Sequence, residues 1–131
     1  MANVLVVDYG IGAARRLGQV ISKMGLKVRE VKGSAAALRE AMADPPDVVL
    51  IDLATESGDG FGLATMLKVQ APARPPKVVH ITAMTGALLS QIESTLRCLG
   101  IDRCVSLMWP LSRQVEAVLG MLGKGASPAT A

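Results

Sequence analysis

Short apolar runs alternate with segments of helical spacing along the whole chain. Unbroken runs of β-branched and aliphatic residues are typical of strands buried on both faces, whereas apolar residues three or four positions apart form the stripe of an amphipathic helix. The pattern predicts strands at residues 4–8, 26–31, 46–52, 78–82 and 103–107. It predicts helices at residues 14–24, 34–42, 61–69, 88–99 and 112–122. Strands and helices therefore alternate through the chain.

This alternation predicts a parallel sheet with helices on both faces. Right-handed crossovers and a short first unit favour the strand order 2-1-3-4-5. We therefore predict an α/β protein, a flavodoxin-like (βα)5 three-layer sandwich with a parallel five-stranded sheet. One domain covers residues 1–122, and residues 123–131 are small and polar enough to form a flexible C-terminal tail.

Several residues suggest how the helices begin and end. Ser34 and Ser112 are good N-caps for the second and last helices, and Gly25 is a C-cap for the first. The methionines fall on the helical stripes and are expected in the core.

Two of the predicted strands end in an acid, Asp8 in the first and Asp52 in the third. In the order 2-1-3-4-5 these strands are neighbours where the chain reverses direction across the sheet, so both carboxylates should lie at its carboxyl edge. Two carboxylates this close repel each other, which disfavours the charge on one of them or demands a cation, and hard oxygen ligands suit Mg²⁺. Thr82 ends the fourth strand at the same edge. An acid, a divalent ion and a hydroxyl together suit phosphoryl transfer to a carboxylate nucleophile.

Composition excludes several other classes of protein. The formal charge is +3 with scattered basic residues, and only three residues are aromatic, so nucleic acid is not an expected partner. Cys98, Cys104 and the single histidine, His80, do not have the spacing of a zinc site. His80 is expected to be a packed strand residue. No segment approaches the roughly 20 apolar residues of a membrane span, so a cytoplasmic protein that does not contact membranes is expected.

The chain resembles the receiver domain of bacterial two-component response regulators over about residues 3–122. The central match is specific: the strand DVVLIDL followed by a D-G loop resembles the phosphoacceptor strand of that family. The other matches are shorter but occur in the right order. The segments that carry the resemblance are VLVVD at 4–8, DVVLIDL at 47–53, DGF at 59–61, ITA at 81–83 and GID at 100–102.

The resemblance implies roles for individual residues. Asp52 would be the phosphoacceptor, and Mg²⁺ would be held by Asp8, Asp52 and the backbone carbonyl of Ala54. Thr82, followed by Ala83, would bind the phosphoryl oxygen as the switch residue. A histidine kinase or a phosphotransfer protein would donate the phosphoryl group, and a downstream protein would contact the face formed by the fourth helix, fifth strand and last helix. The protein would not be an enzyme beyond transfer to its own aspartate.

The site also departs from the family pattern, which makes it partly degenerate. Tyr9 stands where receivers usually carry a second acid, and Trp109 stands where a lysine usually precedes the proline. Ser106 occupies the place of the usual switch aromatic, within a residue or two of register. One carboxylate fewer weakens the Mg²⁺ site, and Glu56 is a candidate to replace it through the loop. Trp109–Pro110 is a candidate cis peptide, since cis bonds are nearly confined to X-Pro.

Two function classes therefore stay open, and an enzyme is a third, less favoured one. The first is a single-domain receiver phosphorylated on Asp52 in a phosphorelay. The alternative is a pseudo-receiver, an interaction module that works without phosphorylation. The segment from Val6 to Gly12 also resembles the opening of class I glutamine amidotransferases, but Cys98 falls in a helical pattern and the only histidine precedes it. That enzymatic interpretation is disfavoured.

Overall fold

The computed structural model describes residues 2–10, 12–52 and 59–122 of the 131-residue chain. Five strands and five helices alternate along these described residues, and the predicted elements are all present. Their bounds are β1 Asn3–Asp8, α1 Ala13–Ser22, β2 Lys27–Lys32, α2 Ser34–Ala43, β3 Val48–Ile51, α3 Asp59–Gln70, β4 Lys77–Thr82, α4 Gly86–Arg97, β5 Arg103–Ser106 and α5 Leu111–Gly120. None of the described helices has the length and apolar character needed to cross a bilayer.

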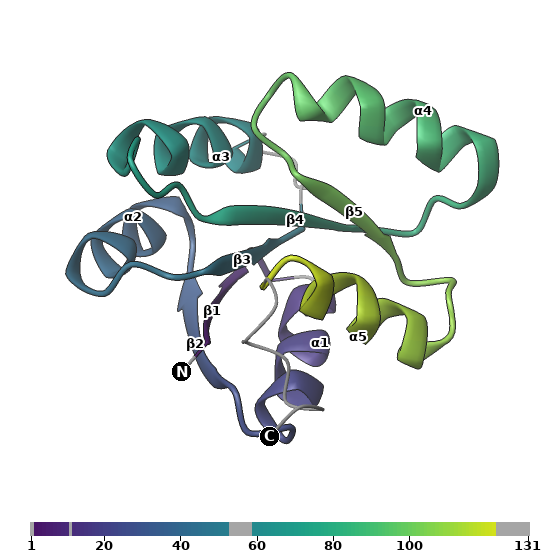
Figure 1. Cartoon of the computed structure of the whole chain (residues 1–131), viewed down its shortest axis with the longest axis horizontal. Helices are drawn as coiled ribbons and strands as arrows, with labels where there is room; N and C mark the ends of the chain where they lie inside the picture. The colour runs from purple at the N-terminus through teal and green to yellow at the C-terminus, as the bar shows by residue number, and fades with distance from the viewer. Residues whose placement is uncertain (1, 11, 53–58, 123–131) are drawn as a thin grey trace.

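The sheet has the order β2-β1-β3-β4-β5, and every pair of neighbouring strands is parallel. Helices α1 and α5 cover one face and α2, α3 and α4 cover the other, as Figure 1 shows. The predicted flavodoxin-like three-layer sandwich is therefore confirmed. β2, whose sequence alternates between polar and apolar residues, lies at one edge of the sheet, and its residues are either half-buried or exposed.

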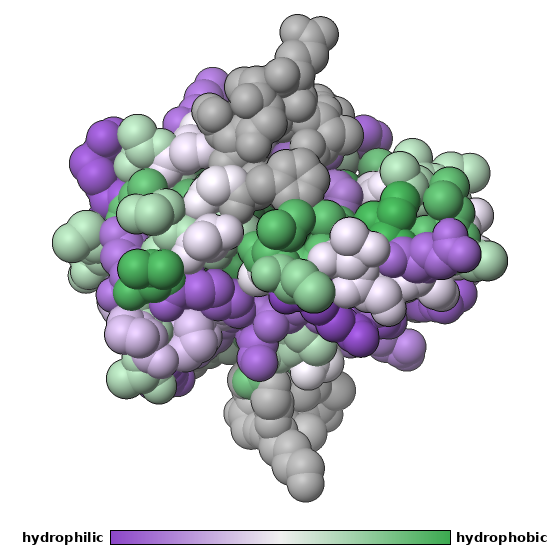
Figure 2. All heavy atoms as spheres, turned by 90° about the horizontal axis from the view of Figure 1, so that it is seen from above, coloured by the Kyte–Doolittle hydropathy of each residue, from purple (hydrophilic) through white to green (hydrophobic). Residues whose placement is uncertain are grey.

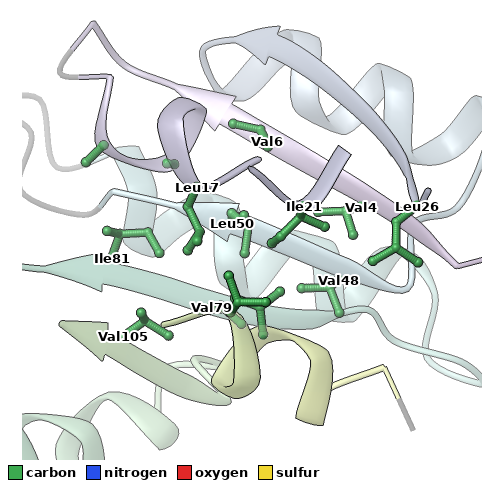
Figure 3. Close-up of a cluster of buried hydrophobic side chains, with 14 of the residues drawn as sticks. Val4, Val6, Leu17, Ile21, Leu26, Val48, Leu50, Val79, Ile81 and Val105 are labelled. Carbon is green, nitrogen blue, oxygen red and sulfur yellow. The ribbon is translucent and has the colours of Figure 1, made fainter. Parts of the chain in front are cut away.

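Each face of the sheet has its own apolar core, because successive residues of a strand point to opposite sides. Val6 and Leu50 pack against Leu17 and Ile21 of α1 on one face, as Figure 3 shows. We call the side of the sheet covered by α1 and α5 the α1/α5 face. Val7 and its neighbours pack against α2, α3 and α4 on the opposite face. β1, β3 and β4 thus bury residues on both faces, which explains their nearly continuous apolar sequences.

Three details differ from the sequence-based predictions. Ser34 and Ser112 are not N-caps: Gly33 and Pro110 occupy those positions, and the helices begin at Ser34 and Leu111. The first helix ends at Ser22, so Gly25 lies in the turn beyond its end. Trp109–Pro110 is a trans peptide.

The prediction that the methionines are core residues is wrong for most of them. Met42 and Met66 lie on helices, which bury only a narrow stripe against the sheet, so a methionine beside that stripe meets solvent. Met24, Met84 and Met108 lie outside the helices, in turns and loops. Figure 2, seen from the side that carries α3 and α4, shows hydrophobic residues interspersed with hydrophilic ones on the surface. The exposed methionines are Met24, Met42, Met66, Met84 and Met108.

Candidate functional site

The site is built at the carboxyl edge of the sheet, where β1 and β3 end side by side. Val7 pairs in register with Ile51, Asp8 is the last residue of β1, and Asp52 directly follows β3. The two aspartates therefore meet at the same rim. The chain reverses its direction across the sheet between these strands, and such switch points are where open α/β sheets hold their ligands.

The backbone around Asp8 holds its carboxylate in one arrangement. Its Oδ1 accepts a hydrogen bond from the Gly10 amide at 2.7 Å, and its carbonyl accepts one from the Gly33 amide at 3.1 Å. Asp8 is half-buried, whereas Asp52 is buried, with 7% of its surface exposed. A buried carboxylate beside a second one is costly unless hydrogen bonds or a cation compensate it.

Thr82 brings a hydroxyl to the same edge. It is the last residue of β4, is buried, and pairs in register with Ser106, the last residue of β5. Its Oγ1 accepts a hydrogen bond from the Met84 amide at 3.2 Å, which fixes the start of the β4–α4 loop, and Ala83 is exposed in that loop. The structure thus brings together Asp8, Asp52 and Thr82 from three adjacent strands.

Tyr9 does not replace the usual second acid at this edge. Tyr9 directly follows Asp8, so the two side chains point to opposite faces of the sheet. The ring of Tyr9 packs against the core beneath α2, α3 and α4. Its hydroxyl forms a hydrogen bond with Ser34 Oγ at 2.7 Å. This bond also explains why Ser34 does not cap α2. The rim beside Asp8 therefore gains no oxygen ligand from Tyr9.

Trp109, which stands where receivers usually carry a lysine, follows β5, the edge strand of the sheet farthest from β2. Its ring stacks with Arg113, whose guanidinium lies 4.0 Å from the ring centroid, and Arg103 lies 5.7 Å away. Its carbonyl accepts a hydrogen bond from Gln114 Nε2 at 2.9 Å. The half-buried indole lines a cavity of about 290 Å³ between α4 and α5. Ser106 is fully buried, and its Oγ accepts from the Met108 amide.

The oxygen atoms available at the acidic rim are of the type that binds a magnesium ion. Asp8 and Asp52 are hard oxygen donors on neighbouring strands, as Mg²⁺ prefers. The described residues contain no group of three or more histidine, cysteine or acidic side chains that could hold a metal ion. The two further ligands named from the sequence, Ala54 and Glu56, lie outside the described residues. When bound, the ion would neutralise charge that develops on oxygen during phosphoryl transfer.

His80 is a packed strand residue beside this site, as the sequence indicated. It is buried and pairs in register with Ile51, directly before Asp52. Burial lowers the pKa of its imidazole below 6.5, while a hydrogen bond with the Ile51 backbone and the charge of Asp52 act in the opposite direction. The neutral ring is therefore the form that the fold favours.

We expect this histidine to make stability fall in mild acid. Its folded pKa is lower than its unfolded pKa, so the unfolded chain binds the proton more readily as the pH drops below about 6.5. The full contribution is present above that pH and is lost below it, with a slope of up to about 1.4 kcal/mol per pH unit. Urea titrations between about pH 7 and pH 5 measure it, with His80→Gln as the non-titrating comparison. Parallel curves for the two proteins would contradict the expectation.

The two cysteines have different environments. Cys104 is buried in β5, and burial, with the nearby Glu93 charge, raises the pKa of its thiol to about 11. Glu93 Oε2 accepts from the Cys104 amide at 2.8 Å, and Glu93 also pairs with Arg103 and Arg97. Cys98, by contrast, is exposed.

One basic residue at this edge was not singled out from the sequence. Lys32 ends β2, as Asp8 ends β1, and the two residues pair in register. The available signal was its position as the last residue of a predicted strand neighbouring the first, but the register of the pair could not be read from the chain.

The fold and the paired acids define a doubly wound α/β domain with an acidic site at its switch point. The sequence-family model that describes the response regulator receiver domain matches residues 4–106 of this chain. The chain belongs to the response regulator receiver family of two-component signalling, and the resemblance noted from the sequence is confirmed.

Curated relatives and solved structures agree with this assignment. The sensory transduction proteins LytT of Bacillus anthracis and Bacillus cereus are each 33% identical over 97 residues, which cover 71% of this chain and 38% of theirs. The chain thus spans less than half the length of these relatives. The chemotaxis response regulator CheY4 of Vibrio cholerae has 18% identity and a TM-score of 0.77, covering 93% of this chain and 99% of that one. A putative response regulator from Chloroflexus aurantiacus has 19% identity and a TM-score of 0.78, covering 94% and 98%. At these identities the solved structures show the shared fold.

Proposed function

We propose that this receiver domain accepts a phosphoryl group on Asp52 in a cytoplasmic phosphorelay. The observation that carries the proposal is the meeting of Asp8 and Asp52 at the rim of β1 and β3, with the buried Thr82 on the next strand. A carboxylate oxygen of Asp52 attacks phosphorus, an O–P bond forms, and the N–P bond to the donor histidine breaks. The donor is a histidine kinase or a phosphotransfer protein, and the acceptor is otherwise not an enzyme.

The signal is proposed to leave through the face formed by α4, β5 and α5. Thr82 is next to β5 in register, so a phosphoryl group near its hydroxyl is adjacent to Ser106. Glu93 joins α4 to β5 through Arg103 and the Cys104 amide, which gives that face a fixed arrangement that a shift of the β4–α4 loop can change. A downstream protein would recognise the changed face.

A phosphoryl analogue tests this function directly. Beryllofluoride with millimolar Mg²⁺ is expected to shift the backbone amide NMR signals of Asp52, Thr82 and the β4–α4 loop, and chelation of Mg²⁺ should reverse the shift. Signals at the amino edge, such as that of Lys77, serve as the internal reference. If no amide signal responds, the site does not bind a phosphoryl group, and a pseudo-receiver that acts without phosphorylation is the function that stands.

A further inference from the structure

Trp109 stands where receivers usually carry a lysine after β5, but another lysine lies on the opposite side of the site. Lys32 is the last residue of β2 and pairs in register with Asp8, and Figure 1 shows β2 beside β1. Residues paired in register on parallel strands point to the same face of a sheet. The cores confirm this for the same two strands: Val4 and its partner Val28 both contact the core of the α1/α5 face.

Lys32 and Asp8 share that α1/α5 face. Lys32 is four residues after Val28, and Asp8 is four residues after Val4, so the two-residue period of a strand keeps each on the same side as its predecessor. Leu50 also packs on this face, and Asp52 follows it by two residues. The row across the carboxyl edge is therefore Lys32, Asp8, Asp52.

The distances allow the lysine to reach the phosphoacceptor. Neighbouring strands are about 4.8 Å apart, so the backbone of Lys32 is about 5 Å from that of Asp8 and about 10 Å from that of Asp52. An extended lysine side chain spans about 6 Å, and a phosphoryl group on Asp52 would extend toward it by several ångströms. The ammonium group can therefore meet phosphoryl oxygens from the β2 side.

Among the residues that the structure describes, the ammonium group of Lys32 is paired with no acid, unlike two other lysines of the chain. Lys27, on the same strand, pairs with Asp44 at 2.7 Å, and Lys68 pairs with Asp102. Lys32 is exposed, and across residues 2–10, 12–52 and 59–122 it forms no ion pair. Lysine on an edge strand also discourages pairing with other chains, but that role does not require a place beside Asp8.

We propose that Lys32 binds the phosphoryl group on Asp52, in place of the lysine that receivers usually carry after the fifth strand. The inference rests on the proposed phosphoryl acceptance. Phosphorylation replaces the single negative charge of the Asp52 carboxylate with roughly two on the phosphoryl group, so the rim carries about three together with Asp8, and one divalent ion does not neutralise that sum. Lys32 supplies a further positive charge and a hydrogen-bond donor from the side of the site opposite Trp109.

The test compares Lys32→Gln with Lys77→Gln in beryllofluoride titrations with Mg²⁺, followed by amide NMR signals. Lys77 is a matched control, since it is an exposed strand-end lysine of the same sheet at the amino edge. Lys32→Gln should weaken beryllofluoride binding on the order of tenfold or more, as expected for a hydrogen bond to a charged group. Lys77→Gln should bind like the wild type, and Lys32→Arg should recover most of the affinity.

Salt separates an electrostatic role from a structural one. The difference between wild type and Lys32→Gln should shrink as ionic strength rises, because charges near the surface are screened. Equal binding by Lys32→Gln and Lys77→Gln would overturn the inference while the proposed function stands. A wild-type protein that does not respond to beryllofluoride would contradict the proposed function itself, and the role of Lys32 with it.

Discussion

Asp52→Asn is expected to abolish phosphorylation of the protein by a small-molecule phosphodonor such as acetyl phosphate. The nucleophile in the proposed transfer is a carboxylate oxygen of Asp52, and the amide oxygen of asparagine is a far weaker nucleophile. Asparagine has nearly the same shape, so the buried position next to β3 stays filled. Intact-mass measurement after incubation with acetyl phosphate and Mg²⁺ is expected to find one added phosphoryl group on the wild type and none on the variant.

Asp47→Asn is the matched control for this experiment. Asp47 lies just before β3, at the amino edge, where its Oδ2 accepts a hydrogen bond from the Asn3 amide at 2.9 Å. Its replacement removes the same charge at the opposite end of the strand, so phosphorylation should continue. Wild-type levels of modification on Asp52→Asn would identify another acceptor. Modification lost equally in both variants would point to a general loss of structure, which a thermal melt detects.

The fold was predictable because its information is local. Runs such as residues 4–7 and 48–51 are apolar throughout since their strands are buried on both faces, and this leaves few alternatives for a chain of five alternating units. The meeting of Asp8 and Asp52 followed from the strand order alone. An acid that ends a buried strand is unusual enough to mark a site without any knowledge of its neighbours.

The parts that could not be predicted depend on contacts between distant residues. Ser34 has the right chemistry for a cap, but the hydroxyl of Tyr9 forms a hydrogen bond with it, and no local pattern reveals that partner. The exposure of Met42 depends on how wide a stripe α2 buries. Lys32 carries the same charge as any other lysine in the sequence, and only the register of β1 with β2 places it beside Asp8.

Leu50→Ala is expected to lower the free energy of unfolding by about 3 kcal/mol, within the range measured for buried leucines. Leu50 is fully buried in β3 and lies between Val6 and Val79 of the flanking strands. Figure 3 shows it within the core on the α1/α5 face, with Leu17 and Ile21 of α1 nearby. Strands on both sides hold this region, so the structure cannot collapse into the space that the side chain leaves. Urea unfolding followed by circular dichroism measures the loss.

Leu88→Ala is the control for this substitution, since the same atoms are removed from a side chain of α4 that is 55% exposed. Its effect should stay within about 0.5 kcal/mol, as is usual for surface positions. A loss below about 1 kcal/mol for Leu50→Ala would contradict the dense packing of the core under α1.

The substitution also bears on the site, because Asp52 follows Leu50 by two residues and lies directly after the end of β3. A looser core there should broaden the NMR signals of Asp8 and Asp52, since the two carboxylates are held side by side by the pairing of β1 with β3.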